Sequence, residues 1–232
     1  PEMGGVGAGV AQAIIMWFQL SLILIIVTRK RFNATRWRTE FSWPKIPIIK
    51  QLVRIGVPIG ATIFTEMGLF SLTTLLLGRF GAETVAAHNI TMNLNGVLFM
   101  PALALGMAAT IRIGFRVGAD EVLDARTTAM IAMLSTVVVA LIGCVLILLF
   151  RHDLVSLYTT EPAVAGLSAT LLLFVVVFLV FDASQATALG ALRGYKDTKV
   201  PMFIAIFSYG AVGLTAECAL GFGWFGEPMG VY

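Results

Sequence analysis

Residues 52–78 read LVRIGVPIGATIFTEMGLFSLTTLLLG, which is long enough to cross a bilayer, because about 20 apolar residues suffice. The interior of this stretch carries one ionisable side chain, Glu66, and one helix-breaking residue, Pro58. At about 1.5 Å of helix rise per residue, Glu66 lies about 18 Å from Arg54 and about 20 Å from Arg79. A carboxyl group near the middle of the hydrocarbon costs about 2.5–3.5 kcal/mol on insertion scales, and an ionisable group at this depth indicates a function. The structural alternative is a protonated Glu66 that hydrogen-bonds to a neighbouring helix.

The composition is that of an integral membrane protein. The 232 residues are 58% hydrophobic and 12% charged, with a mean hydropathy of +0.91. A soluble domain carries about 25% charged residues. Long apolar segments of this kind are helices, because closed helices satisfy every backbone polar group in lipid, and an all-α polytopic membrane helix bundle is therefore expected. The apolar segments lie at about 6–28, 52–78, 84–117, 127–150, 163–190 and 200–222.

The basic residues alternate between the two ends of these segments. All but two of the 16 Lys and Arg residues fall in the connections 29–54, 112–126 and 193–199. The other two connections hold Arg79 and Arg151. By the positive-inside rule the three basic connections are cytoplasmic, so we expect a multi-pass protein of the inner cell membrane. The basic residues set this orientation, and nucleic-acid binding is not expected.

A second intramembrane acid, Asp182, lies in LLLFVVVFLVFDASQATALGALRG, residues 171–194. It stands about 16 Å from Arg193 along a helix. Glu66 is about equally far from its own cytoplasmic end, so the two acids are predicted at nearly the same depth on helices that run in opposite directions. Gln185 shares the face of Asp182 at i+3 and is a candidate supporting residue.

A row of polar residues opens the third segment, in AAHNITMNLNG, residues 86–96. Asn89 and Asn93 share a helix face at i, i+4. Such a row can line a cavity or tie helices together, and the tie is the slightly favoured interpretation. For His88, near the outer boundary, a structural role is favoured over proton transfer.

Two prolines and four small residues predict local helix geometry. Pro58 and Pro101 each remove a backbone donor and predict helix kinks. Bent helices near the midplane are where transporters place binding sites, and packing alone is the open alternative. The small residues Ala183, Ser184, Ala186 and Gly190 would let a neighbouring helix approach closely.

Three features near the segment ends receive structural interpretations. Leu154, Leu157 and Tyr158 suggest a short interfacial helix after the fourth segment. Asp120 is expected to cap the N-terminus of the fourth segment. Glu217, near the outer end of the last segment, is interpreted as snorkelling or lining a vestibule.

Five strings in this order and spacing resemble the multidrug and toxic compound extrusion (MATE) family, in its NorM-like bacterial branch: IGVPIGATIFTEMGLFSL, AAHNITMNLNG, AATIRIGFRVG, VFDASQ and GALRGYKDTKVP. The resemblance runs essentially end to end and implies the MATE fold, mostly its C-terminal lobe. Residues 1–28 would be the last helix of the N-terminal lobe, 29–51 the cytoplasmic loop between the lobes, and 52–232 five helices of the C-terminal lobe. We therefore expect part of a longer, twelve-helix chain, without its first five helices and its last.

The resemblance implies export of hydrophobic organic cations in exchange for Na⁺ or H⁺, with no enzymatic activity and no cofactor besides the coupling ion. It implies that Glu66 and Asp182 bind the cation or Na⁺, and it places the family's eighth-helix asparagine at Asn93. Phe178 stands where NorM-like sequences often carry Tyr, and Asn89 replaces a usual Gln, so the coupling ion stays open between Na⁺ and H⁺. Asn89, Asn93 and Phe178 are supporting candidates.

The physical account stands beside the resemblance. A carboxylate in a low dielectric requires a proton, a metal cation or an organic cation to neutralise it, so two acids at one depth make these occupants compete. Alternating access would come from one helix bundle rocking against another, in a protein expected to be a monomer in the bilayer. Cation–π contacts with aromatic walls would add about 0.5–2 kcal/mol, although core or lipid packing is the alternative for each ring. The candidate rings are Phe64, Phe70, Phe178 and Phe181.

Three other functions fit the sequence less well. A lipid-linked saccharide flippase needs cations in its cavity to hold pyrophosphate, and no Lys or Arg falls well inside a segment. An intramembrane aspartyl protease needs two Asp residues, typically with a GxGD motif that is absent here. A channel is not excluded.

Overall fold

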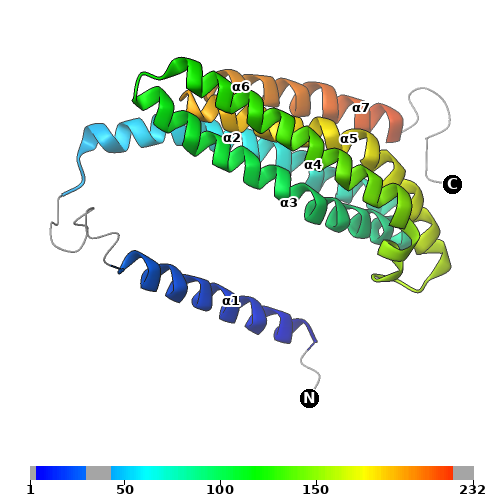
Figure 1. Ribbon diagram of the computed structural model, residues 1–232. Helices are drawn as coiled ribbons and strands as arrows, with labels where there is room; N and C mark the ends of the chain where they lie inside the picture. Colours follow the sequence, from blue (N-terminus) through cyan, green and yellow to red (C-terminus); the bar gives the residue numbers. More distant parts are fainter. Residues whose placement is uncertain (1–3, 30–42, 222–232) are drawn as a thin grey trace. The chain divides into compact units, whose positions relative to one another are not determined.

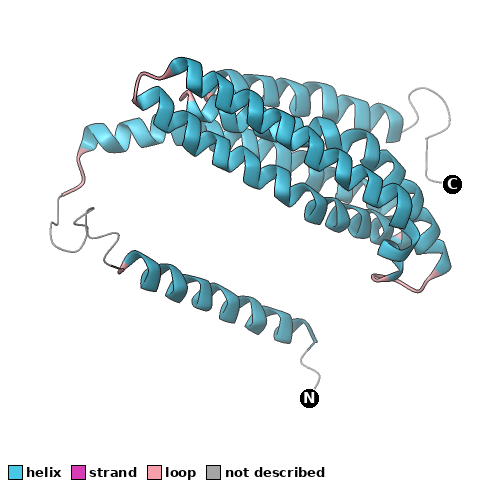
Figure 2. Ribbon diagram, viewed as in Figure 1, coloured by secondary structure: helices cyan, strands magenta, loops and turns pink. Residues whose placement is uncertain are grey.

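The computed structural model describes residues 4–29 and 43–221, and this part of the chain consists of helices and their connections, without strands (Figure 2). It divides into two units, residues 1–50 and 51–232, each described by itself. Within the described ranges, 6 helices are long and apolar enough to cross a membrane. The all-α membrane bundle expected from the sequence is confirmed.

From α2 onward, the helices follow one another with short connections (Figure 1). The last three elements form one continuous helical segment whose middle is π-helical. Each apolar segment of the sequence corresponds to one such continuous helical segment. In chain order the elements are α1 (Gly4–Val27), α2 (Ile46–Leu77), the 3₁₀ turn η2 (Gly78–Phe80), α3 (Ala82–Gly118), α4 (Val122–Ser156), α5 (Pro162–Gly194), α6 (Lys199–Ala205), the π-helical η3 (Ile206–Gly213) and α7 (Leu214–Gly221).

The helix α2 begins earlier than the sequence analysis expected. It starts at Ile46, so the end of the predicted inter-lobe loop is helical, and residues 30–42 of that loop lie outside the described residues. Pro47 falls in the first turn, where its missing N–H would have no partner and its fixed φ suits a helix. Pro58 and Pro101 both lie inside continuous helices, so the kinks at these prolines stay a prediction.

The core of the second unit lies among α3, α4 and α5, which pack against one another. In lipid this packing is driven by van der Waals contact and helix–helix hydrogen bonds, because lipid tails are as apolar as leucine. Thr136 of α4 and Thr187 of α5 add a buried hydroxyl–hydroxyl bond of 2.7 Å. The main buried cluster contains Leu94, Cys144, Ile147, Val155, Leu172, Val175 and Leu179.

Small residues bring α3 and α5 into backbone contact. A Cβ atom on Gly190 would lie 2.3 Å from the carbonyl oxygen of Gly106, which no real structure tolerates. At this crossing the Thr110 hydroxyl donates to the Gly190 carbonyl oxygen at 2.7 Å. Ala183 is fully buried nearby. The predicted close helix approach at Ala183 and Gly190 is confirmed, and the approaching helix is α3.

Two expectations at the helix ends are wrong. No separate interfacial helix follows the fourth segment, because α4 continues to Ser156 and Leu154 packs against the core cluster. Asp120 does not cap α4, whose N-cap position is Glu121, without a side-chain cap bond. Asp120 instead takes a left-handed backbone conformation, φ 60°, in the turn before α4, which Asp tolerates better than most residues.

Candidate functional site

Glu66 of α2 and Asp182 of α5 line the same cavity, whose volume is about 360 Å³. Small-molecule sites typically measure roughly 300–1,000 Å³. Both acids are half-buried. The rest of the lining comes from α2 and α3 and comprises Met67, Phe70, Ser71, Thr74, His88, Asn89, Met92, Asn95 and Phe99.

Helical spacing explains why these side chains share one wall. On α2, Glu66, Phe70 and Thr74 follow one another at intervals of four residues, which places them on one face. On α3 the lining positions follow an i, i+4, i+7, i+11 pattern, which also marks one helix face. These α3 positions are His88, Met92, Asn95 and Phe99.

The electrostatics of the cavity suit a cation. Glu66 lies within electrostatic range of Asp182 and of Arg193. The two charges have opposite effects on the Glu66 carboxyl group. Tyr209 of η3 lies within electrostatic range of both acids. No Lys or Arg lines the cavity. Within the described residues no group of three or more His, Cys, Asp and Glu gathers as a metal cage, so the oxygen donors here are two carboxylates and neighbouring neutral groups.

Asn95, on the wall of this cavity, has a side-chain oxygen that accepts no hydrogen bond. Its side chain is 8% exposed, and its Oδ1 atom is buried without a hydrogen-bond partner. Leaving a buried acceptor unsatisfied costs about 1–3 kcal/mol. In the sequence, Asn95 is one member of the polar row in residues 86–96. Its spacing of seven residues from His88 is the signal that would have placed it on the cavity face.

The two asparagines selected from the sequence separate in the structure. Asn89 lines the cavity. Asn93 does not, and its Oδ1 accepts a hydrogen bond from the Tyr158 hydroxyl at 2.8 Å, which ties α3 to the connection between α4 and α5. His88 lines the cavity as well, although a structural role was favoured for it.

Gln185 does not line the cavity of the acids. Its Nε2 atom donates to the Tyr209 hydroxyl at 2.6 Å, and both residues line a second cavity of about 320 Å³ between α5 and the α6–η3 segment. Tyr209 lies in the π-helical η3, and π-helical turns are frequent at functional sites. The sequence analysis missed Tyr209, because a π-helical turn carries no clear sequence signal.

Of the four aromatic rings considered from the sequence, Phe70 lines the cavity, and Phe99 joins it. Phe64 and Phe181 are 80% and 74% exposed, because offsets of two and one residues from the acids turn them away on a helix. Phe178 packs against the core cluster of α3, α4 and α5.

Glu217 does not snorkel. Thr73 of α2 donates to its Oε1 atom at 2.5 Å, and its Oε2 atom is buried without a partner. The Thr73 hydroxyl also lies 2.9 Å from the Leu69 carbonyl oxygen of its own helix. The pair therefore links α2 to α7, outside the cavity of the two acids.

The MatE family model matches residues 58–216, which includes both acids and most of the second unit. The chain belongs to the MatE family. It is 38% identical to the multidrug resistance protein PmpM of Pseudomonas aeruginosa over 99% of this chain and 49% of that protein. It is 36% identical to the multidrug resistance protein NorM of Vibrio cholerae, over 99% of this chain and 51% of that protein.

The MatE chain thus spans about half the length of the curated relatives that it matches. A solved MOP superfamily transporter from Pyrococcus furiosus shares its fold, with a TM-score of 0.68 over 76% of this chain and 39% of the other, at 16% identity. The resemblance to the multidrug extrusion family is confirmed, and the protein is a multi-pass membrane protein of a transporter family.

Proposed function

We propose that residues 52–232 form most of one lobe of a secondary active antiporter that exports hydrophobic organic cations in exchange for Na⁺ or H⁺, and that residues 1–28 belong to its other lobe. The observation that carries this proposal is the single cavity lined by Glu66 and Asp182. Both acids come from membrane-spanning helices, and no basic residue of the lining neutralises them. A proton, Na⁺ or a cationic drug would each satisfy the same negative charge, so entry of one favours release of another.

Residues around the acids would complete the site. Asn95 and Asn89 offer neutral amide groups on the α3 wall, and Phe70 and Phe99 offer ring faces to a flat cation. Ring–cation contact adds about 0.5–2 kcal/mol where water is excluded. The Gln185–Tyr209 pair holds a hydroxyl within electrostatic range of the acids, a polar group in place of the tyrosine absent at 178.

The proposal extends to orientation and motion. The basic connections at 29–54, 112–126 and 193–199 would face the cytoplasm from the inner membrane, as the positive-inside rule demands. A second lobe would close the other side of the cavity, and rocking of the two lobes would expose it alternately, in a monomer. A saccharide flippase is less favoured, because its pyrophosphate would meet two carboxylates and no lysine or arginine in this cavity.

The test is ethidium efflux from cells that make the full-length protein, under an imposed Na⁺ gradient and separately under an imposed H⁺ gradient. Glu66→Gln and Asp182→Asn keep the size of each side chain and remove its charge. Losing one partner of a buried charge pair weakens binding by about 2–5 kcal/mol, so we expect efflux to fall well over tenfold in each variant.

The matched control is Glu83→Gln, which removes an exposed acid from the first turn of α3 without touching the cavity. It should transport as the unsubstituted protein does. Efflux that persists in both cavity variants would refute the proposed role of the acids, and a response to one gradient alone would identify the coupling ion.

A further inference from the structure

A third cavity lies away from the two acids, at the basic end of α2. It is a cavity of about 390 Å³, within the size range of small-molecule sites. Three cations line it: Arg54 from α2, Lys196 from the connection between α5 and α6, and Lys199 from the first position of α6. Segments far apart in the sequence thus bring their positive charges to one hollow. The remaining lining residues are Gln51, Ile55, Asp197 and Thr198.

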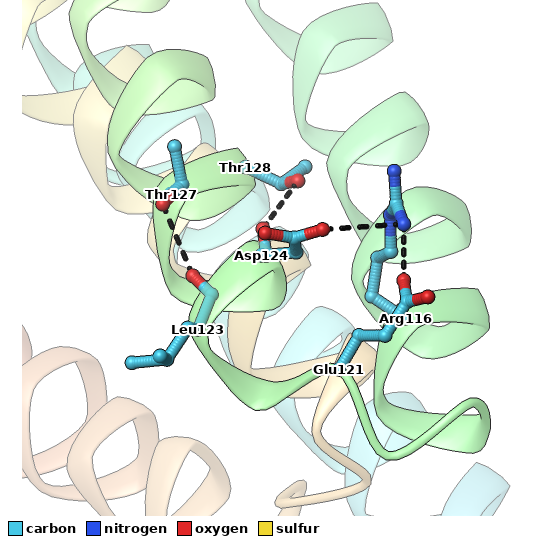
Figure 3. Close-up of polar contacts among 6 residues, drawn as sticks. All are labelled: Arg116, Glu121, Leu123, Asp124, Thr127 and Thr128. Carbon is cyan, nitrogen blue, oxygen red and sulfur yellow. Dashed lines mark hydrogen bonds and ion pairs between the residues drawn. The ribbon is translucent and has the colours of Figure 1, made fainter.

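Elsewhere at this end of the molecule, the chain neutralises a cation with its own acids. Arg116, in the last turn of α3, pairs with Glu121 and lies 3.3 Å from Asp124 of α4 (Figure 3). The close-up shows the guanidinium facing both carboxylates across the α3–α4 turn. At this end of the molecule, acidic side chains of the chain itself thus neutralise Arg116.

The three cations of the pocket are not neutralised in this way. Arg54, Lys196 and Lys199 make no ion pair with any other residue in the part of the chain that the structure describes. Asp197 lies in the same wall, but its Oδ1 atom accepts the Val200 N–H at 3.4 Å and serves the start of α6. The pocket therefore keeps an excess of positive charge.

The backbone at Lys196 is costly for a lysine. Lys196 has φ 63°, and its N–H donates to the Arg193 carbonyl at 3.0 Å, while the Asp197 N–H donates to the Leu192 carbonyl at 3.0 Å. This is the helix-ending motif in which the left-handed position is usually glycine. A lysine that keeps this conformation carries strain, and such strain gathers at ligand sites. Lys196 thus places a charged side chain in the cavity wall at a position where glycine would cost less.

The depth of the pocket places it among lipid headgroups. Arg54 lies about 18 Å along α2 from Glu66. Half the thickness of the hydrocarbon is about 15 Å, so a midplane position for Glu66 puts Arg54 just outside the hydrocarbon. In the orientation proposed above, this is the level of the cytoplasmic headgroups, where anionic lipids attract basic residues next to membrane spans.

We propose that this pocket binds a phosphate-bearing anion, with the headgroup of an anionic phospholipid in the cytoplasmic leaflet as its source. The phosphate would lie among Arg54, Lys196 and Lys199 and neutralise their charge. It would also bridge α2 to the α5–α6 connection. That bridge matters for α2, whose buried residues in the described structure are Pro58 and Thr62. A bound headgroup would therefore hold the helix of Glu66 at its basic end.

The experiment measures the melting temperature of the purified full-length protein in detergent, and the lipid it retains in native mass spectrometry. Dioleoyl phosphatidylglycerol, dioleoyl phosphatidylcholine and inorganic phosphate are added in separate arms. The test variant combines Lys196→Gly with Lys199→Gln. Glycine relieves the left-handed strain at position 196, so this variant is expected to fold at least as well as the unsubstituted protein. We expect its phosphatidylglycerol affinity to fall about 30-fold, and phosphatidylcholine to have no effect on either protein.

Two further variants separate a pocket from diffuse surface charge. Arg112→Gln with Arg126→Gln removes the same charge from the same end of the molecule outside the pocket, and it should keep the phosphatidylglycerol effect. Lys196→Arg with Lys199→Arg keeps the charge and should also bind. A melting shift by inorganic phosphate that depends on the two lysines would support the anion site and make soluble phosphate its source. Equal phosphatidylglycerol binding by the test variant and the unsubstituted protein would overturn the proposal, as would equal losses in the test and Arg112/Arg126 variants.

Discussion

The buried amide of Asn95 shows how one side chain can weaken the fold and serve the site. Its oxygen has no donor in the described structure, although the residue is almost fully buried on the cavity wall. A protein selected for stability alone would place an apolar residue there. A position that lowers stability while facing two acids is typical of a binding site.

Replacing Asn95 with leucine tests this interpretation. Asn95→Leu removes the unsatisfied acceptor, so we expect a gain of about 1–3 kcal/mol in stability without bound cation, together with ethidium efflux reduced about tenfold or more. Thermal melting and the efflux assay measure the two effects. Asn93→Leu is the matched control two residues away and outside the cavity, and it loses the hydrogen bond from the Tyr158 hydroxyl. It should lower stability by about 0.5–1.5 kcal/mol and leave transport intact. Full efflux in Asn95→Leu would contradict a role for this amide.

The contact between α3 and α5 fixes where Asp182 stands. Backbone approaches backbone at Gly190 and Gly106, and Thr110 closes the crossing with a hydrogen bond. Because no side chain separates the helices there, α5 cannot slide or rotate without breaking this contact. The acid therefore sits on a rigid element, whereas Glu66 sits on α2, which buries few residues.

Gly190→Ala probes this crossing directly. The added methyl group meets the Gly106 carbonyl oxygen at 2.3 Å, so the helices must separate, and overpacking of this kind costs about 1–3 kcal/mol. Gly166→Ala on the same helix adds its methyl group to open space and should be neutral or stabilising by about 0.5–1 kcal/mol. Unfolding in detergent with added denaturant compares the two. Equal stability of the two variants would show that α3 and α5 are not in contact at this point.

The distribution of charge over the whole molecule decides which end faces the cytoplasm. The helix α4 offers the simplest test, because exposed residues mark its two ends, Arg126 near the start and Asp153 near the finish. The basic end carries the α3–α4 and α5–α6 connections, and the other end carries few cations.

Single cysteines at these positions report the orientation. Cys144 and Cys218 are first replaced with alanine, and Asp153→Cys or Arg126→Cys is then introduced. We expect a membrane-impermeant maleimide to label position 153 in intact cells and position 126 only after the membrane is opened. The reverse pattern would invert the proposed topology and would place the phosphate pocket in the outer leaflet.

Sequence alone determined the membrane class, the positions of the spanning helices and the two intramembrane acids. Each of these depends on local composition and on distance along one helix, and both can be counted without knowledge of neighbours. The ends of helices were predicted less well. Pro47 lies in the first turn of α2, and Asp120 lies in the turn before α4 and does not cap it. Helix ends are hard to predict because they depend on a few competing hydrogen bonds.

Tertiary structure alone decided which polar residues meet. It brought Asn95 to the cavity and gave Asn93 to Tyr158, although both stand in the same row of the sequence. It also placed Tyr209 against Gln185, and it gathered Arg54 with Lys196 from the far end of the chain. Contacts between helices depend on rotation about each helix axis and on close approach at glycines. Neither the rotation nor the close approach is set by composition or spacing. Lipid solvates every apolar helix face equally well, so only packing against specific neighbours determines which face is buried.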